Sequence, residues 1–382
     1  MNKPYQPSCR HFPTCSGCSH ALSLSVSPLW HEILLYSQGK VNPLLREGSP
    51  LHWRCRAKLA VRGNVENPQI GLFKRYSHDL VPIPDCLVHH PKINQAVELI
   101  RQWMIHHRVV PYQETEGRGE LRYLQLVVER ETGQIQASFV VHSKAVSARW
   151  KQLLESLQSD HPDLWHSLWL NFNDRMTNTI FGETWLKISG EEFLWEKFGH
   201  IHVCYLPATF GQANLNLFEK MLERIHQWIP AHAKVTEYFA GVGAIGLYLA
   251  EKCAWVRCEE ANPNAEGCFL HSKERLPQLI ASRLCYSTLP AEKALHLMEE
   301  ATTLIVDPPR KGLTSPVKKA LIHSSAQQII YVSCGWESFK RDCDDFLNNG
   351  LILKELEGYT FFPGSDYIEV LAHFERNLSE RI

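Results

Sequence analysis

Two short apolar stretches of the sequence stop abruptly on side chains that can do chemistry. Residues 304–306 lead into Asp307-Pro308-Pro309, and residues 329–332 lead into Ser333 and Cys334. Apolar runs of this length are typical of buried strands, and ligands of open α/β sheets bind at the carboxyl ends of the strands. We therefore expect both ends to share one active site, with Cys334 as a nucleophile beside a bound cofactor. The alternative for this cysteine is a small buried hydrophobe.

A third reactive side chain, Glu369, lies in a late stretch rich in Val, Leu and Ile. Burying a carboxylate without a purpose is costly, so a glutamate in such a strand indicates a function. We expect Glu369 to be the base of the active site. The alternative is a solvent-facing residue on an edge strand.

A glycine-rich loop predicts a nucleotide-like cofactor. Residues 235–247 carry G-x-G-x-x-G, with Gly241 and Gly243 as its first glycines, and such glycines permit a tight turn and close backbone approach to a ligand. About twenty residues further on, Glu259 and Glu260 end a second strand, where a carboxylate can bind two ribose hydroxyls. These features fit a dinucleotide or S-adenosylmethionine. Asp307-Pro308-Pro309 favours the second, because methyltransferases of planar substrates use an acid or amide before Pro-Pro at this strand end, with the prolines keeping the chain rigid.

These groups permit a covalent route to methylation of a pyrimidine. C5 of uracil is a poor nucleophile toward a methyl sulfonium, but a thiolate that adds to C6 makes C5 enolate-like. C5 then attacks the methyl group, a base removes the C5 proton, and the thiolate leaves. The route requires a cysteine with a depressed pKa or a base nearby, and a carboxylate that accepts the proton. A target base in RNA must leave its stack to reach such a site.

The N-terminal cysteines predict a metal or cluster site. Cys9-x5-Cys15-x2-Cys18 supplies three thiolates, and Cys86, on a proline-rich loop, is the best fourth candidate. His11, His20, His89 and His90 are competitors for the fourth position. From spacing alone, an iron–sulfur cluster and a zinc ion are close to equal. Seven further cysteines lack ligand spacing and are expected to be small buried or surface residues: Cys55, Cys204, Cys253, Cys258, Cys268, Cys285 and Cys343.

The patterns along the chain predict an α/β protein in three parts. From residue 206, strand–loop–helix units continue to the C-terminus, which is typical of a Rossmann-like parallel sheet wrapped by helices. The preceding region is β-rich, with a strand over 57–63 and a hairpin over 120–128 and 134–141. Apolar residues recur at helical spacing over 93–107 and 214–229. The expected boundaries are 1–39 for the cysteine-bearing segment, 40–205 for a β-rich central domain and 206–382 for the Rossmann-like domain.

The chain of 382 residues has a net charge of −1, but its charge is unevenly distributed. Residues 40–150 carry 16 Lys/Arg and 10 Asp/Glu, so this part is +6 and the remainder is −7. A basic module beside an acidic one suits a protein whose basic part faces phosphate. Arg54, Arg56, Lys58 and Arg62 recur at period two, so they belong to one sheet face. That face is either a phosphate-binding strip or a solvated surface.

Two further features concern location. No apolar run approaches the roughly 18 residues that a membrane helix needs. Residues 1–5 are polar, unlike the start of a signal peptide. We expect a cytoplasmic protein with no membrane association and no obligate protein partner.

Taken together, the motifs resemble the S-adenosylmethionine-dependent RNA uracil-C5 methyltransferases that carry a cysteine-ligated 4Fe–4S cluster. The resemblance spans nearly the whole chain and rests on Cys9-x5-Cys15-x2-Cys18 with Cys86, Phe210-Gly211-Gln212-Ala213-Asn214, Phe239-Ala240-Gly241-Val242-Gly243, Asp307-Pro308-Pro309-Arg310-Lys311-Gly312, Ser333-Cys334, and Phe362-Pro363 leading to Glu369. It implies a class I methyltransferase domain, a central RNA-binding domain, and S-adenosylmethionine and a 4Fe–4S cluster as cofactors. There is no room before Cys9 for the TRAM domain of many members. In this the chain resembles the shorter branch, which methylates a loop uracil in 23S ribosomal RNA.

The resemblance also implies roles for individual residues. Cys334 is the nucleophile and Glu369 the proton acceptor. The implied cofactor contacts are Gln212, Phe239, Gly241, Gly243, Glu260 and Asp307, and the implied cluster ligands are Cys9, Cys15, Cys18 and Cys86. Glu260 is preferred to Glu259 because residues 261–265 then align with the family. Three residues depart from the family: Gly211 stands for an aromatic residue, Gly335 for the Asn after the nucleophile, and Tyr367 for the His two residues before the base.

Three other hypotheses remain open. The same reaction on a transfer RNA uracil fits the motifs equally well. A non-catalytic RNA-binding or chaperone protein that retains the fold predicts that Cys334→Ala leaves the biological effect unchanged. A nicotinamide-dependent dehydrogenase is more distant and predicts binding of NAD instead of S-adenosylmethionine.

Overall fold

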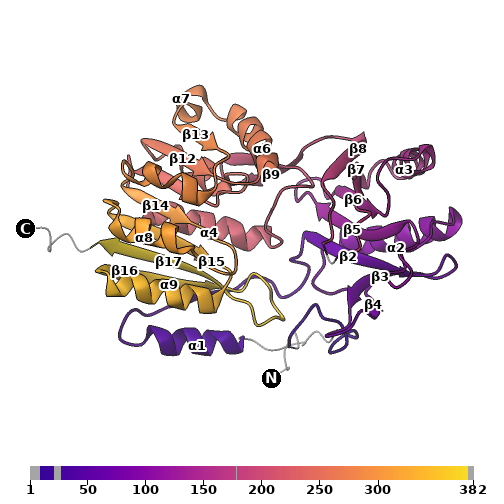
Figure 1. The fold of residues 1–382 in the computed structure, drawn as a ribbon, viewed down its shortest axis with the longest axis horizontal. Coiled ribbons are helices and arrows are strands. Elements are labelled where there is room, and N and C mark those ends of the chain that lie inside the picture. The colour runs from indigo at the N-terminus through magenta and orange to yellow at the C-terminus, as the bar shows by residue number, and fades with distance from the viewer. Residues whose placement is uncertain (1–8, 21–26, 178, 377–382) are drawn as a thin grey trace, which may run out of the picture.

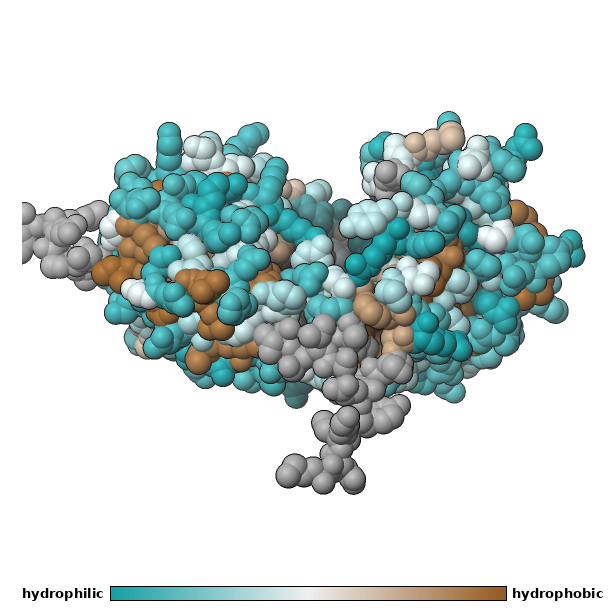
Figure 2. Space-filling view, turned by 90° about the horizontal axis from the view of Figure 1, so that it is seen from below, coloured by the Kyte–Doolittle hydropathy of each residue, from teal (hydrophilic) through white to brown (hydrophobic). Residues whose placement is uncertain are grey.

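The computed structural model describes residues 9–20, 27–177 and 179–376, so the polar residues 1–5 lie outside the described part. Two lobes lie side by side (Figure 1), and a hollow separates them on the face shown in Figure 2, where both surfaces are largely hydrophilic. Among the described residues, no helix combines the length and apolar character needed to cross a membrane.

The C-terminal lobe is built on one mixed sheet. Its described strands follow the order β1-β16-β17-β15-β14-β11-β12-β13. They are β1 (Leu44–Arg46), β11 (Lys234–Tyr238), β12 (Trp255–Glu259), β13 (Leu284–Ser287), β14 (Thr303–Val306), β15 (Gln328–Ser333), β16 (Leu351–Tyr359) and β17 (Glu369–Arg376). β17 runs antiparallel between β15 and β16, and the other neighbours pair in parallel. The α/β fold predicted from the sequence is confirmed.

Helices cover both faces of this sheet. One face packs on α4 (Leu215–Trp228), α5 (Ala244–Leu249), α6 (Pro263–Glu274) and α7 (Gln278–Ala281). The other packs on α1 (Pro28–Ser37), α8 (Ser315–His323), α9 (Trp336–Asn348) and the 3₁₀ turns η1 (Ala291–Lys293) and η2 (Leu295–Met298). α4 forms where predicted because its buried residues recur at helical spacing. Asn214 caps it by accepting a hydrogen bond from the Leu217 amide at 3.3 Å.

The other lobe contains a second sheet. Its described strands follow the order β4-β3-β2-β5-β6-β7-β8. They are β2 (Arg56–Gly63), β3 (Pro68–Phe73), β4 (Leu80–Pro82), β5 (Leu121–Val128), β6 (Ile135–Val141), β7 (Trp165–Phe172) and β8 (Thr184–Gly190), with helices α2 (Pro91–His106) and α3 (Ala148–Asp160). β5 and β6 pair antiparallel, so the predicted hairpin is confirmed, as are the strand over 57–63 and the helix over 93–107.

Two segments within the expected central domain, residues 40–205, pack on the C-terminal lobe. β1 adds to the sheet of the C-terminal lobe by pairing with β16. The hairpin of β9 (Leu194–Phe198) and β10 (Ile201–Tyr205) packs on the same lobe, where the Cys204 amide donates to the Ser272 hydroxyl of α6 at 3.0 Å. Both placements depend on tertiary pairing, and a three-residue strand carries no periodic signal by which a sequence could reveal it.

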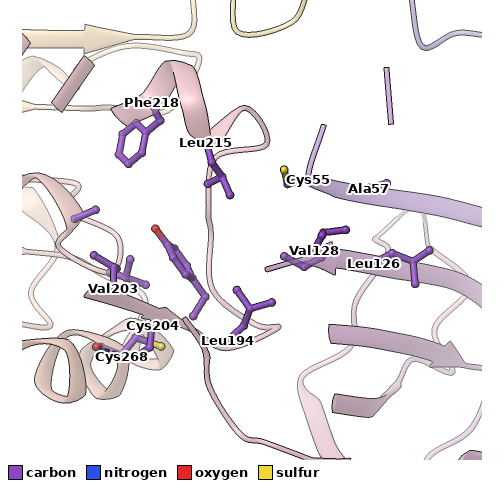
Figure 3. Packing of buried hydrophobic residues seen from close by; sticks show 14 of the residues in the cluster. Cys55, Ala57, Leu126, Val128, Leu194, Val203, Cys204, Leu215, Phe218 and Cys268 are labelled. Atoms are coloured by element: carbon purple, nitrogen blue, oxygen red, sulfur yellow. Dashed lines mark hydrogen bonds between the residues drawn. The ribbon is translucent and has the colours of Figure 1, made fainter. Parts of the chain in front are cut away.

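One hydrophobic core runs through both lobes. Figure 3 shows their junction. Cys55, which directly precedes β2, and Leu126 of β5 lie opposite Leu194, Leu215 and Phe218 from the C-terminal lobe. A continuous apolar core of this kind holds two lobes in one arrangement because separating them would expose it to water.

Candidate active site

The sheet places Cys334 and Glu369 next to each other. In the antiparallel pair of β15 and β17, Ser333 lies opposite Val370, so the next residues in register are Cys334 and Glu369. Glu369 also pairs with Tyr359 of β16. The two expected catalytic residues, far apart in the sequence, therefore meet at one end of β15 and β17, which are neighbours in the sheet of the C-terminal lobe.

Local sequence explains why the strands stop there. β14 ends at Val306, and Pro308 and Pro309 lack the amide hydrogens that would extend the ladder. β15 ends at Ser333, whose hydroxyl accepts the Gly335 amide at 3.2 Å as the chain turns into α9. Asp307 at the end of β14 thus joins Cys334 and Glu369 at the same edge.

The electrostatics of the three groups are coupled. Burial, reinforced by the nearby Asp307 carboxylate and opposed by Arg310, raises the pKa of Glu369 to about 8. Burial, reinforced by Glu260, raises the pKa of Asp307 to about 7. Burial raises the pKa of Cys334 as well, and Glu369 and Asp307 add to that effect while Arg310 opposes it. The thiol thus has a base nearby, but it does not have the depressed pKa that is the other way to activate a cysteine.

Arg310 is the residue that sequence reasoning left without a role. Its guanidinium carbon lies 4.5 Å from the centre of the Tyr367 ring, and its charge acts on both Cys334 and Glu369. The Ser338 hydroxyl of α9 holds the Arg310 carbonyl at 2.8 Å. The sequence did contain a signal for this role. Arg310 directly follows Pro308-Pro309, and the two rigid prolines fix where its backbone lies.

The glycine loop lies at the end of β11, as expected from the sequence. Gly243, at φ +76°, precedes α5, and a Cβ there would lie 2.4 Å from Phe269 Cδ2. Gly241, at φ +57°, has open space where a Cβ would stand, which leaves room for a ligand to approach the loop. Phe239 also adopts a positive φ, of 62°. This rarely populated conformation is held by the turn and places the loop beside Asp307.

A cavity of about 50 Å³ collects most of the expected cofactor residues. Its lining includes Gln212, Phe239, Gly241 and Asp307. Glu260 lies against the same loop, because its carboxylate accepts the Gly241 amide at 2.9 Å and the Asn262 amide at 2.7 Å. Glu259 is buried with an exposed fraction of 3%. Of the two acids, Glu260 is the one that faces the glycine loop.

Glu237 is a further cavity residue that sequence reasoning missed. It is 1% exposed, and its carboxylate accepts the Gly246 amide of α5 at 2.8 Å. Burial is the main cause that raises its pKa to about 8. Its place directly before the glycine loop was the available signal, and its contact indicates that it supports the start of α5.

Two departures from the family pattern have a steric explanation. A Cβ at position 335 would lie 2.5 Å from the Arg310 carbonyl oxygen, so the turn after Cys334 accepts only glycine. A Cβ at position 211 would lie 2.9 Å from Arg56 Nη2 and 3.1 Å from the Tyr205 ring. In this chain, the guanidinium of Arg56 occupies space that a larger residue at 211 would need.

The four expected ligand cysteines line a second cavity, of about 240 Å³, in the other lobe. Cys9, Cys15 and Cys18 belong to residues 9–20, called the cysteine loop below, and Cys86 follows β4. Burial, together with Cys86, Cys15 and Cys9, raises the pKa of Cys18 to about 11, as expected for thiols gathered at one place. Within the described residues, no three His, Cys, Asp or Glu side chains are arranged to hold a single metal ion. His11 and His89 also line the cavity.

The expected basic strip is divided by the structure. Lys58 is exposed, with its ammonium 4.7 Å from the Phe181 ring. Arg56 donates to the Thr209 carbonyl at 3.1 Å, and Arg62 is buried and paired with Glu114. Arg62 therefore does not face phosphate, because its charge is already neutralised by a partner within the lobe.

Comparisons with known proteins extend along nearly the whole chain. An uncharacterized RNA methyltransferase of Protochlamydia amoebophila is 49% identical over 374 residues, which is 97% of each chain. An uncharacterized RNA methyltransferase of Geobacter sulfurreducens is 28% identical over 98% of this chain and 78% of its own. No protein-family model matches the chain.

Among solved structures, the tRNA (uracil-54, C5)-methyltransferase of Pyrococcus abyssi, in complex with S-adenosyl-L-homocysteine, is similar in fold. The TM-score is 0.77 at 20% sequence identity, over 95% of this chain and 86% of that one. The likeness covers both lobes.

Proposed function

Because the chain belongs to the RNA methyltransferases, we propose that it transfers a methyl group from S-adenosylmethionine to C5 of a uracil in 23S ribosomal RNA, in the cytoplasm. The observation that carries the proposal is the pairing of Cys334 and Glu369 at the facing ends of β15 and β17. A nucleophile and a base on neighbouring strands can act on two adjacent atoms of one pyrimidine ring.

The roles of the residues follow from their positions. The Cys334 thiolate adds to C6, which gives C5 the electron density to accept a methyl group. Glu369 then removes the C5 proton, the C5–C6 double bond re-forms, and the thiolate leaves. Arg310 lies where it can stabilise the Cys334 thiolate and the Glu369 carboxylate, since its charge lowers the pKa of both groups.

The cavity beside Asp307 supports binding of S-adenosylmethionine, which supplies the methyl group. Gln212, Phe239, Asp307 and the backbone at Gly241 line the cavity, Gly243 shapes the loop, and Glu260 holds it. A neighbouring fold crystallised with S-adenosyl-L-homocysteine adds support. These positions support the predicted cofactor contacts.

We also propose that Cys9, Cys15, Cys18 and Cys86 hold a 4Fe–4S cluster. The donor set is suitable, because four thiolates are the ligands of such a cluster. A single zinc ion held by the same thiolates is the rival, since the four thiols line one cavity that either group could occupy. A brown protein that contains iron and sulfide is expected, and a colourless protein with stoichiometric zinc would overturn the proposal.

The test of the reaction uses RNA that contains 5-fluorouracil. The fluorine at C5 is not removed as a proton, so elimination stalls and the protein stays bound to RNA through Cys334. We expect a covalent complex that survives denaturing electrophoresis and maps to the peptide with Cys334. If the protein methylates natural RNA but forms no complex with the fluorinated RNA, Cys334 is not the nucleophile.

A transfer RNA uracil is the second candidate substrate, because the neighbour of similar fold acts on tRNA. Mass-spectrometric mapping of methyluridine in ribosomal and transfer RNA, with and without the gene, distinguishes the two. A non-catalytic RNA-binding or chaperone role would leave both maps unchanged.

A further inference from the structure

The cysteine loop makes direct hydrogen bonds to the segment that leads into Glu369. The Ser19 amide donates to the Gly364 carbonyl at 2.7 Å, and the His20 amide donates to the same oxygen at 3.1 Å. His20 Nε2 lies 3.0 Å from the Ser365 carbonyl oxygen. Because a carbonyl only accepts, this ring nitrogen carries the hydrogen. The loop therefore connects one lobe to the active-site edge of the other.

A second contact joins the same regions through side chains. Phe362 packs in one small cluster with Cys18 and Cys86. Its ring centre lies 5.7 Å from that of Trp53, and the guanidinium of Arg54 lies within 5.5 Å of it. The start of the segment before Glu369 thus packs against the same buried pair, Trp53 and Val88, as two of the four expected ligand cysteines.

The cysteine loop is itself anchored to the sheet of β2–β8 in its own lobe. The Ser16 amide donates to the Phe73 carbonyl at 3.3 Å, Cys15 forms a bridge with Lys74, and Arg75 donates to the Cys18 carbonyl. These contacts to the β3–β4 hairpin therefore hold the loop in place.

The segment between Phe362 and Glu369 is a compact turn. The Ser365 amide and hydroxyl both donate to the Phe362 carbonyl, at 3.0 and 2.7 Å. The Tyr367 amide donates to the Ser365 hydroxyl at 3.4 Å. Two residues later, Glu369 enters β17. A shift of Gly364 or Ser365 is transmitted over only four or five residues to the carboxylate.

From these contacts we propose that Ser19 and His20 are positioning residues for Glu369, so that the cysteine loop sets the orientation of the base that removes the C5 proton. The inference rests on the proposed function, because it assigns that role to Glu369. It gives the cysteine site a role that does not require electron transfer. The ordered cysteine loop holds the turn at residues 362–367, and that turn orients Glu369.

The test uses two matched pairs of variants in the full-length holoprotein. Ser19→Pro removes the amide hydrogen that reaches Gly364, and Ser19→Ala retains it. His20→Ala removes the ring contact, and His31→Ala makes the same change at an exposed position of α1. His20→Ala also keeps the test decisive if Ser19→Pro does not fold.

The first readout is deuterium exchange of the amides of Ser365 and Tyr367, which needs no RNA. Loss of one hydrogen bond is expected to speed their exchange about fivefold in Ser19→Pro and His20→Ala. Ser19→Ala and His31→Ala are expected to match the parent protein. Unchanged exchange in both test variants would overturn the proposal, whatever the protein does to RNA.

The second readout is the covalent complex formed with natural uracil RNA. Slower proton removal by Glu369 prolongs the stage after Cys334 has added, so the trapped fraction is expected to rise about fivefold and kcat to fall, while kcat/KM for RNA stays constant. Faster exchange with no rise in the complex would also overturn the proposal. Failure of the proposed function is recognised separately, because the parent protein would then transfer no methyl group.

Discussion

The two sulfur sites of this molecule are built in opposite ways. Cys334 follows a buried strand whose register with β17 fixes its neighbour, and the prolines after Asp307 fix the strand beside it. The four clustered cysteines instead lie in loops around a cavity, held by a few hydrogen bonds to the β3–β4 hairpin and to Gly364. The first site is thus organised by the sheet, whereas the second is organised by loop contacts.

That difference predicts different responses to damage. A substitution at the strand end is expected to remove chemistry and leave the fold intact. A substitution in the cysteine loop is expected to weaken local structure first and chemistry second, through the contacts of Ser19 and His20. The following changes test that contrast, starting with the largest expected effect.

Cys334→Ala is expected to reduce methyl transfer by at least about 10⁴-fold, since no other group supplies the nucleophile. The covalent complex with 5-fluorouracil RNA should disappear, while the iron content and melting temperature stay unchanged. The assay is transfer of a labelled methyl group to RNA. Cys285→Ala, at an exposed cysteine, is the matched control and should keep full activity. Equal losses in both variants would contradict the assignment.

Cys18→Ser is expected to lower the iron content and reduce activity by about 10- to 100-fold, an intermediate effect. The covalent complex should still form, because Cys334 and its strand are untouched. Iron and sulfide analysis and the complex assay check both parts. A loss of activity as complete as that of Cys334→Ala, with iron retained, would remove the contrast between the sites.

The sequence revealed the sheet-built site more fully than the loop-built one. Asp307 and Cys334 follow the ends of two parallel strands, and such ends converge by geometry alone. Glu369 begins the neighbouring antiparallel strand β17 and therefore lies at the same edge. The expected ligand cysteines also gather, but nothing in the spacing of Cys9, Cys15 and Cys18 could report that the following residue, Ser19, bonds to Gly364. Such contacts depend on the packing of two lobes, as does the pairing of β1 with β16.

Individual charges were the least predictable from the sequence. Of the four basic residues at period two, Arg54 precedes β2 and the other three alternate along it, yet Arg62 is buried against Glu114 while Lys58 is exposed. Periodicity assigns a face, but the partner of each side chain is set by segments distant in sequence. The raised pKa of Cys334 has the same origin, since it comes from burial and from Glu369.

Glu369→Gln is expected to stop proton removal and to stabilise the fold above neutral pH. The folded-state pKa of about 8 exceeds the unfolded value near 4.3. Ionisation of Glu369 therefore lowers the free energy of unfolding as pH rises from about 4.3 to 8. Removing the ionisable group should therefore add stability of the order of 5 kcal/mol at pH 8.5 and little at pH 4. Thermal unfolding at both pH values is the measurement. In the parent protein, activity should rise with pH up to about 8, as Glu369 loses its proton.

Tyr367→Ala is expected to reduce activity about three- to tenfold, because Arg310 loses the ring that supports its guanidinium. The pH at which activity is half-maximal should rise, since Arg310 opposes the raised pKa values of both Cys334 and Glu369. Tyr367→Phe keeps the ring and should retain the parent profile. An identical profile in the Ala and Phe variants would show that the ring does not position Arg310.

Lys58→Ala should have the smallest effect on activity. Which parameter changes, KM and salt dependence or kcat, is more informative than the size of the change. The ammonium lies on the basic face of β2, near the ring of Phe181, and no acidic partner neutralises it among the described residues. If that face binds phosphate, KM for RNA should rise a few-fold, and the slope of log affinity against log salt should fall by about one unit, with kcat unchanged. Lys319→Ala, an exposed lysine of α8 in the other lobe, should change none of these. A salt slope that stays constant in Lys58→Ala would mean that the central sheet carries this charge only as a solvated surface.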